Sequence, residues 1–207
     1  MIGVVDYGLG NLHSVLKALA HHGAAAELVA TPAAVAGCSR LILPGVGAFA
    51  DGMRGLRERG LDEALVAFAA SGRPLAGICL GAQLLATTGE EFGTHVGLGI
   101  IPGRVVRIPA EAVKVPHVGW NRLVAPVGRS WSGTPLVGTV AGTWAYFVHS
   151  YHVVPDDPQD VLAVTSHGPH TITAAVGRGA ITGFQFHPEK SGQAGLAMLR
   201  LFLGESL

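Results

Sequence analysis

The sequence predicts an α/β protein with an open, mostly parallel sheet flanked by helices, and with antiparallel strands and hairpins in its C-terminal half. Up to about residue 79, short apolar runs alternate with segments of helical periodicity, the pattern of parallel strands joined by crossover helices. From about residue 99, apolar or alternating segments are broken by Gly, Pro and Asp, which is typical of antiparallel strands. The length of 207 residues suits one hydrophobic core, so we expect a single domain over residues 1–207.

The first part of the chain contains four expected strands and three expected helices. The strands are short apolar runs at residues 2–6, 25–30, 39–45 and 73–79. Asn11 is a suitable cap for the first helix, whose apolar residues recur at helical spacing up to Gly23. Thr31 and Pro32 occupy the cap and first-turn positions of a short second helix, and residues 61–72 form a third that ends at a glycine. This order implies a parallel sheet with helices on both faces.

The second part of the chain is expected to be mainly strands. They lie at residues 99–108, 143–154, 161–167 and 171–187. Residues 195–203 close the chain with a helical pattern. No internal repeat, low-complexity tract or long linker interrupts the sequence, which agrees with one domain.

The composition argues against several kinds of partner. The 14 basic side chains balance 14 acidic ones, so neither a nucleic acid nor an anionic membrane is expected to bind. The N-terminus has no basic region, and no run approaches the roughly 18 apolar residues of a membrane span, so we expect a cytoplasmic protein with two reduced thiols. The low charge and 30 glycines slightly favour a surface covered by another chain, although a glycine-rich enzyme with tight loops has the same composition.

One cysteine lies where a strand is expected to turn abruptly into a helix. In "GICLGAQLL", Cys79 stands between Gly77 and Gly81. In open α/β folds such a turn lies at the carboxyl edge of the sheet, where ligands bind, and flanking glycines are what a nucleophile elbow needs. The first amides of the following helix favour a thiolate there. We interpret Cys79 as a nucleophile and Cys38 as a small buried hydrophobe, which most free cysteines are.

A nucleophilic cysteine needs a base, and the base needs a group that fixes its tautomer. The segment "GFQFHPEKS" offers His187 and Glu189, which would project to the same side of an extended chain restricted by Pro188. Taken alone, a histidine after an aromatic strand is more often a packed or surface residue. Together with Cys79, the two residues complete a Cys–His–Glu set.

An acyl transfer also needs hydrogen-bond donors for the oxyanion of its intermediate. The amide of Leu80, next to the cysteine, is one candidate. A second comes from the strand end in "LPGVGAF", at Val46 or Gly47, although that motif alone also fits a tight strand-to-helix turn. Gln83 follows Cys79 by four residues, so its carboxamide shares a helix face with the thiol and is placed to bind a polar substrate.

Three motifs in this order, "PGVGAF", "GICLGAQ" and "FHPEKS", resemble the class I, or triad-type, glutamine amidotransferases. Three further segments, "DYGLGNLHSV", "VPHVGWN" and "YFVHSYH", are similar to the family of glutaminase subunits of imidazole glycerol phosphate synthase. The resemblance extends over essentially the whole chain.

The resemblance implies hydrolysis of L-glutamine to glutamate and ammonia without a cofactor, with Cys79 as nucleophile, His187 as general base and acid, and Glu189 orienting the histidine. It implies glutamine contacts at Gly47, Gln83, Ser150 and Tyr151. It also implies a (βα)8-barrel cyclase subunit that receives the ammonia and forms imidazole glycerol phosphate and aminoimidazole carboxamide ribotide in histidine biosynthesis. The positions expected at that heterodimer interface are Asn11, Trp120, Tyr146 and Lys190.

Several alternatives share part of this pattern. Amidotransferases of anthranilate or aminodeoxychorismate synthesis share the triad, and cysteine peptidases or chaperones of related α/β fold share the elbow. A non-catalytic regulatory subunit would need none of the three residues. A metal site is not expected, because His149 and His152 point to opposite faces of an extended strand and no cysteine or carboxylate cluster accompanies them.

Overall fold

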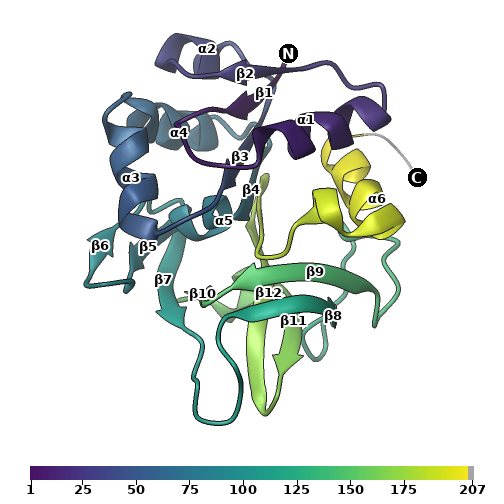
Figure 1. Cartoon of the computed structure of the whole chain (residues 1–207). Coiled ribbons are helices and arrows are strands. Elements are labelled where there is room, and N and C mark those ends of the chain that lie inside the picture. Colours follow the sequence, from purple (N-terminus) through teal and green to yellow (C-terminus); the bar gives the residue numbers. More distant parts are fainter. Residues whose placement is uncertain (205–207) are drawn as a thin grey trace.

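A seven-stranded sheet forms the centre of the structure, a computed structural model that describes residues 1–204 (Figure 1). In spatial order, its strands are β11 (Val161–His167), β12 (His170–Arg178), β13 (Ile181–Phe184), β4 (Leu75–Cys79), β3 (Arg40–Gly45), β1 (Ile2–Val5) and β2 (Ala26–Val29). Neighbouring strands from β2 to β13 pair in parallel, whereas β12 and β11 add to the sheet antiparallel. The predicted fold class is confirmed, since the antiparallel strands lie in the C-terminal half.

Helices cover both faces of this sheet (Figure 1). They are α1 (Leu12–His21), α2 (Pro32–Ala36), α3 (Phe49–Arg57), α4 (Leu61–Ala70), α5 (Leu80–Leu84) and α6 (Gly192–Phe202). Val35 of α2, Leu56 of α3 and Phe68 of α4 belong to one buried cluster, and Leu19 of α1 and Met198 of α6 belong to the other. Burial of these apolar faces on both sides of the sheet holds the strand ends in fixed positions.

Two smaller sheets complete the structure. One has four strands in the order β10 (Tyr151–Pro155), β7 (Ile101–Arg107), β5 (Ala86–Gly89) and β6 (His95–Val96), and the other is an antiparallel ribbon of β8 (His117–Arg122) and β9 (Trp144–His149). Single 3-10 turns lie at η1 (Pro158–Asp160) and η2 (Pro188–Lys190). Strand β9 passes the carboxyl end of β4, where the Val148 carbonyl oxygen lies 3.9 Å from Cys79 Sγ.

The expected caps of the first two helices are confirmed. Asn11 Oδ1 accepts a hydrogen bond from the Ser14 amide at 3.4 Å, and Thr31 Oγ1 accepts one from the Ala34 amide at 3.3 Å. These bonds satisfy amides that have no partner within the helix.

Two expected segments differ from the structure. Residues 143–154 form two strands in different sheets, because the chain bends at Ser150 between β9 and β10. The expected strand over 171–187 turns at Gly179 and ends at Phe184, before the histidine. Helix α3 had no sequence prediction, since two glycines interrupt its helical pattern.

Candidate active site

Cys79 lies at a strained elbow between β4 and α5. It has φ 55° and ψ −111°, a backbone conformation that non-glycine residues rarely adopt. A side chain at Gly77 would come within 2.6 Å of the Gly81 carbonyl oxygen, and one at Gly81 would overlap the Leu43 carbonyl. Both glycines are therefore required for this turn, as the sequence predicted. Helix α5 is only five residues long, and the Cys79 side chain makes no capping hydrogen bond to its amides.

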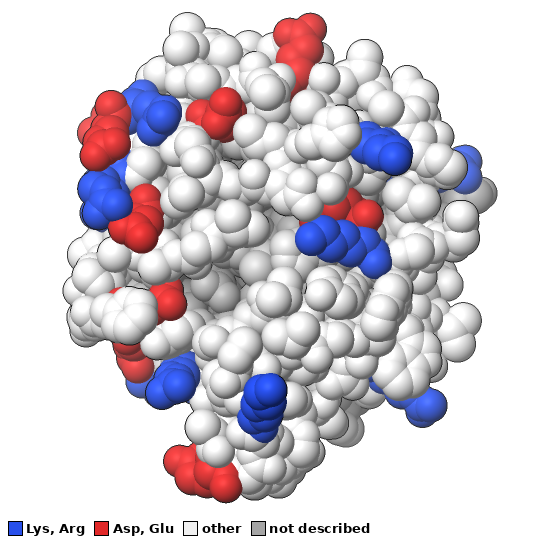
Figure 2. Space-filling view, viewed as in Figure 1, with Lys and Arg blue, Asp and Glu red and all other residues white. Residues whose placement is uncertain are grey.

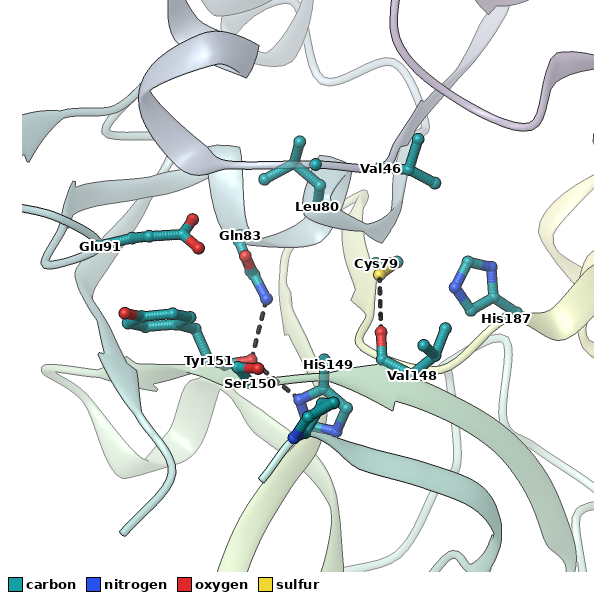
Figure 3. Close-up of a pocket in the computed structure, with 12 residues that line it drawn as sticks. Val46, Cys79, Leu80, Gln83, Glu91, Val148, His149, Ser150, Tyr151 and His187 are labelled. Carbon is teal, nitrogen blue, oxygen red and sulfur yellow. Dashed lines mark hydrogen bonds between the residues drawn. The ribbon is translucent and has the colours of Figure 1, made fainter. Parts of the chain in front are cut away.

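A pocket of about 330 Å³ opens beside this cysteine (Figure 3). It is lined by Val46, Gly47, Cys79, Leu80, Gln83, Glu91, Pro116, Val148, His149, Ser150, Tyr151 and His187. The structure thus brings together the residues chosen from the sequence for thiol chemistry and for glutamine binding, from segments up to 141 positions apart (187 − 46). Glu189 is not in the lining, because it lies behind His187.

His187 and Glu189 form a buried pair. His187 Nδ1 lies 2.8 Å from Glu189 Oε1, and the two side chains are 3% and 1% exposed. The expected extended geometry is wrong, since Glu189 belongs to the 3-10 turn η2, and this turn folds the carboxylate back onto the ring. The backbone of His187 is fixed as well: its amide donates to the Tyr146 carbonyl, and its carbonyl accepts from Ser191 Oγ.

The surroundings of His187 favour its charged form. Burial lowers the pKa of His187, but interactions with Cys79 and Glu189 outweigh burial and raise the pKa from 6.5 to about 9. The interaction with the thiol is not a completed hydrogen bond, since Nε2 has no partner in bonding geometry within residues 1–204. In Figure 3 the His187 ring lies beside Cys79 with a nitrogen turned toward the sulfur. The arrangement favours an imidazolium next to Sγ, with Nε2 available for proton transfer.

Polar groups surround the rest of the pocket. Gln83 Nε2 donates to the Tyr151 carbonyl at 2.9 Å and to Gln185 Oε1 at 3.1 Å, and Gln185 Nε2 lies 4.0 Å from Cys79 Sγ. Val46 and Leu80 lie above the cysteine in Figure 3, on the side opposite the Val148 carbonyl. The pocket therefore combines a thiol, an imidazole paired with a carboxylate, and the carboxamide of Gln83, with that of Gln185 next to it, which are the groups that an acyl-transfer site requires.

Five residues in or next to the pocket were not predicted from the sequence as site residues: Glu91, Pro116, Val148, His149 and Gln185. Two of them have polar side chains held by hydrogen bonds within or beside the pocket and were not considered at all. Glu91 Oε2 accepts a hydrogen bond from the Phe49 amide at 2.8 Å, which holds its carboxylate at the pocket wall. Gln185 is buried and touches both Gln83 and the thiol. Glu91 follows another glutamate in a turn, a pattern typical of a solvated surface. Gln185 lies within the same motif as His187, two residues before it, and this position is the sequence signal that points to it.

The expected interface residues lie near the site. Trp120 is 52% exposed, and its ring meets that of Tyr146 at 6.0 Å between centroids. Tyr146 in turn lies 6.5 Å from the His187 ring. Lys190 is exposed on η2, and α1, which begins after Asn11, packs against that turn. Charged side chains are sparse across the middle of this face, which is hollowed there (Figure 2).

No group of three or more His, Cys, Asp or Glu side chains within residues 1–204 is arranged to hold a metal ion. The same residues contain no helix with the length and hydropathy that a bilayer crossing requires. Cys38 and Cys79 are both free and buried.

A thiol at a strand–helix elbow beside a buried His–Glu pair, on an open α/β sheet, defines a triad-type amidohydrolase. The family model described as "Glutamine amidotransferase class-I" matches residues 3–205, and the chain belongs to this family.

The chain is 47% identical to the imidazole glycerol phosphate synthase subunit HisH of Synechococcus sp. (strain JA-3-3Ab), with 98% of this chain and 92% of that protein covered. It is 50% identical to the subunit of the same name from Symbiobacterium thermophilum, with 96% and 91% covered. A crystal structure of a glutamine amidotransferase superposes with a TM-score of 0.75 at 22% identity, covering 98% of this chain and 97% of that one, which supports the fold.

Proposed function

We propose that this glutamine amidotransferase hydrolyses L-glutamine to glutamate and ammonia through Cys79, His187 and Glu189. The observation that carries the proposal is the placement of the elbow thiol and the imidazole on one pocket, with Glu189 Oε1 2.8 Å from the far ring nitrogen. An ion-paired imidazole stabilises negative charge on sulfur, which is the form that attacks a carboxamide.

In the first half of the reaction, Cys79 Sγ forms a bond to the side-chain carbonyl carbon of glutamine, and the carbonyl π electrons move to oxygen. The amides of Leu80 and of Val46 or Gly47 hold this oxyanion, since all three residues line the pocket near the sulfur. His187 gives its Nε2 proton to the leaving nitrogen, the carbon–nitrogen bond breaks, and ammonia leaves behind a thioester.

In the second half, His187 takes a proton from water, and the resulting hydroxide attacks the thioester carbon. The carbon–sulfur bond breaks, so glutamate and the Cys79 sulfur are released. Glu189 keeps Nδ1 protonated and the ring oriented through both steps, because its buried carboxylate can only accept.

Glutamine is held by the polar wall of the same pocket. Gln83 and the backbone at Ser150 and Tyr151 face the space next to the thiol, and Gly47 leaves room for the substrate because it has no side chain. The Glu91 carboxylate, at the pocket wall, is suited to the ammonium group of an amino acid. These contacts select a free α-amino acid over a peptide.

The ammonia passes to a (βα)8-barrel cyclase subunit that docks on this chain and forms imidazole glycerol phosphate in histidine biosynthesis. Support comes from relatives that are named as subunits of imidazole glycerol phosphate synthase and are covered over more than nine-tenths of their length. The outer side of the β8–β9 ribbon supplies a docking surface of alternate residues. Its members are the exposed Val118, Trp120, Trp144 and Val148 and the half-buried Tyr146. Lys190 lies on η2, which packs against β9, and Asn11 caps α1, which packs against η2.

Glutamate release by the complex of this chain with the cyclase tests the proposed function. Cys79→Ala removes glutamine-dependent turnover, while the cyclase reaction driven by added ammonium stays intact. Cys38→Ala is the matched control, because that thiol is also buried and free but lies outside the pocket. Retained glutaminase activity in Cys79→Ala, or its loss in Cys38→Ala alone, contradicts the assignment.

A further inference from the structure

A chain of hydrogen bonds runs from strand β8 to the glutamine pocket through two buried histidines. Asn121 Nδ2 lies 3.2 Å from His117 Nε2, and His117 Nδ1 lies 3.1 Å from His149 Nε2. His149 Nδ1 then lies 2.8 Å from the Tyr151 carbonyl oxygen, in the pocket wall. The two histidines face each other because they are opposite partners in the β8–β9 register.

The first and last groups of this series of hydrogen bonds, the Asn121 amide and the Tyr151 carbonyl, fix the direction of every bond. The Tyr151 carbonyl can only accept, so the proton of His149 is on Nδ1. Asn121 Nδ2 can only donate, so His117 Nε2 carries no proton. The bond between the rings therefore requires His117 Nδ1–H to donate to an unprotonated His149 Nε2. Both rings are neutral and carry their proton on Nδ1, which is the less common tautomer of free histidine.

The orientation of the Asn121 amide is fixed independently. Its Nδ2 also donates to the Ser166 carbonyl at 2.6 Å, and its Oδ1 accepts from the Arg122 amide at 2.8 Å. A flipped amide would lose both bonds and would set two acceptors against each other at Ser166. Backbone groups on both sides of the Asn121 amide therefore determine that Nδ2 is the atom that donates to His117.

An added proton on either ring would place two donors opposite each other in a buried site. Burial, together with the neighbouring His167, lowers the pKa of His117 to about 4. Burial, together with the neighbouring His117, His152 and His167, outweighs the hydrogen bond to Tyr151 and lowers the pKa of His149 to about 3. Both rings are therefore neutral at neutral pH, and the hydrogen bonds between them are kept.

We propose that Asn121, His117 and His149 are positioning residues that hold the Tyr151 carbonyl, and with it the Ser150–Tyr151 wall, in the geometry that binds glutamine. This inference rests on the proposed function of the pocket. We call these three residues and their hydrogen bonds the relay. The same carbonyl accepts from Gln83 Nε2 at 2.9 Å, so Gln83 and His149, the last residue of the relay, hold it from two sides, as Figure 3 shows. The relay lies on the inner side of the ribbon, away from the exposed residues of the docking surface.

The tautomers are tested directly by nitrogen-15 NMR of the wild-type chain with labelled histidine. The proposal predicts pyrrole-type Nδ1 and pyridine-type Nε2 signals for both rings, and a scalar coupling across the bond from His117 Nδ1 to His149 Nε2. A pyrrole-type Nε2 on either ring would overturn the relay. This arm does not depend on any enzymatic activity.

The positioning role is tested by glutamine kinetics of His149→Phe in the complete complex. Loss of the bond to Tyr151 should raise KM by about tenfold, the effect of one hydrogen bond of about 1.4 kcal/mol, with kcat changed less than about threefold. His149→Gln keeps one donor and one acceptor and should recover most of the KM. His152→Phe is the matched control, since His152 is also buried but bonds to the Thr173 amide outside the pocket.

The outcomes separate the two proposals. An unchanged KM in His149→Phe, or an equal rise in His152→Phe, overturns the positioning role and leaves the glutaminase assignment standing. A wild-type complex without glutaminase activity overturns the proposed function, while the NMR result still decides whether the relay exists. If His149→Phe does not fold, His149→Gln and the wild-type NMR measurement carry the test.

Discussion

Glu189→Gln isolates the charge of the residue behind His187. Glutamine can still accept from Nδ1, so the ring orientation is kept while the negative charge is lost. The rise of the His187 pKa from 6.5 to about 9 corresponds to about 3 kcal/mol in favour of the imidazolium, at about 1.4 kcal/mol per pH unit. Because Cys79 also raises this pKa and Glu189→Gln keeps the hydrogen bond to Nδ1, we expect the substitution to remove less than half of this effect, equivalent to less than about tenfold in rate.

The direction of the pH effect follows from the same values. The imidazolium is present below the folded-state pKa and is lost as the pH rises through about 9, so glutamine hydrolysis by the wild type should decline there. In Glu189→Gln the decline should move to lower pH, because the negative charge that favours the imidazolium is lost. The assay is glutamate release against pH in the complex with the cyclase. An unmoved alkaline limb, or an effect on KM with kcat unchanged, would refute the charge-stabilising role of Glu189.

Three further predictions follow from the structure. A glutamine-analogue diazo-ketone should label Cys79 alone, as mass spectrometry of the treated protein would show, and labelling elsewhere contradicts its role as nucleophile. Trp120→Ala should weaken binding of the cyclase by about 2 kcal/mol in titration calorimetry, without changing the urea midpoint of the isolated chain. Gly81→Ala should destabilise the fold by about 3 kcal/mol or more, because the new methyl group overlaps the Leu43 carbonyl, whereas Gly37→Ala, with ordinary contacts, should cost less than about 1 kcal/mol. Similar urea midpoints for the two glycine variants would contradict the steric argument.

The parts of the fold that sequence patterns predicted are those determined locally. These local determinants act on neighbouring residues, so a short stretch of sequence is enough to predict their effect. They are the apolar runs, the caps Asn11 and Thr31, and the glycines beside Cys79. The His187–Glu189 contact was expected for the wrong reason. The spacing of two residues suggested a strand, whereas Pro188 begins a 3-10 turn that brings the carboxylate to the ring.

The unpredicted parts depend on contacts between distant segments. Glu91 reaches the pocket because its carboxylate bonds to the Phe49 amide, 42 residues away in sequence. The pairing of His117 with His149 depends on the register of β8 and β9, which no local pattern specifies. From the sequence, His149 was considered only as a metal ligand. Its place in the hydrogen-bond relay depends on Asn121 at one end and the Tyr151 carbonyl at the other, which only the folded structure brings together.

The most direct test of the central claim is glutamate release by the purified chain, measured alone and with the cyclase and its nucleotide ligand. A glutaminase whose ammonia is passed to a partner should be nearly silent alone and strongly activated in the complex, with one ammonia incorporated for each glutamate released. A rate that is high alone and unchanged on mixing would contradict the partner and pathway. Absence of glutamate in both conditions would contradict the glutaminase itself.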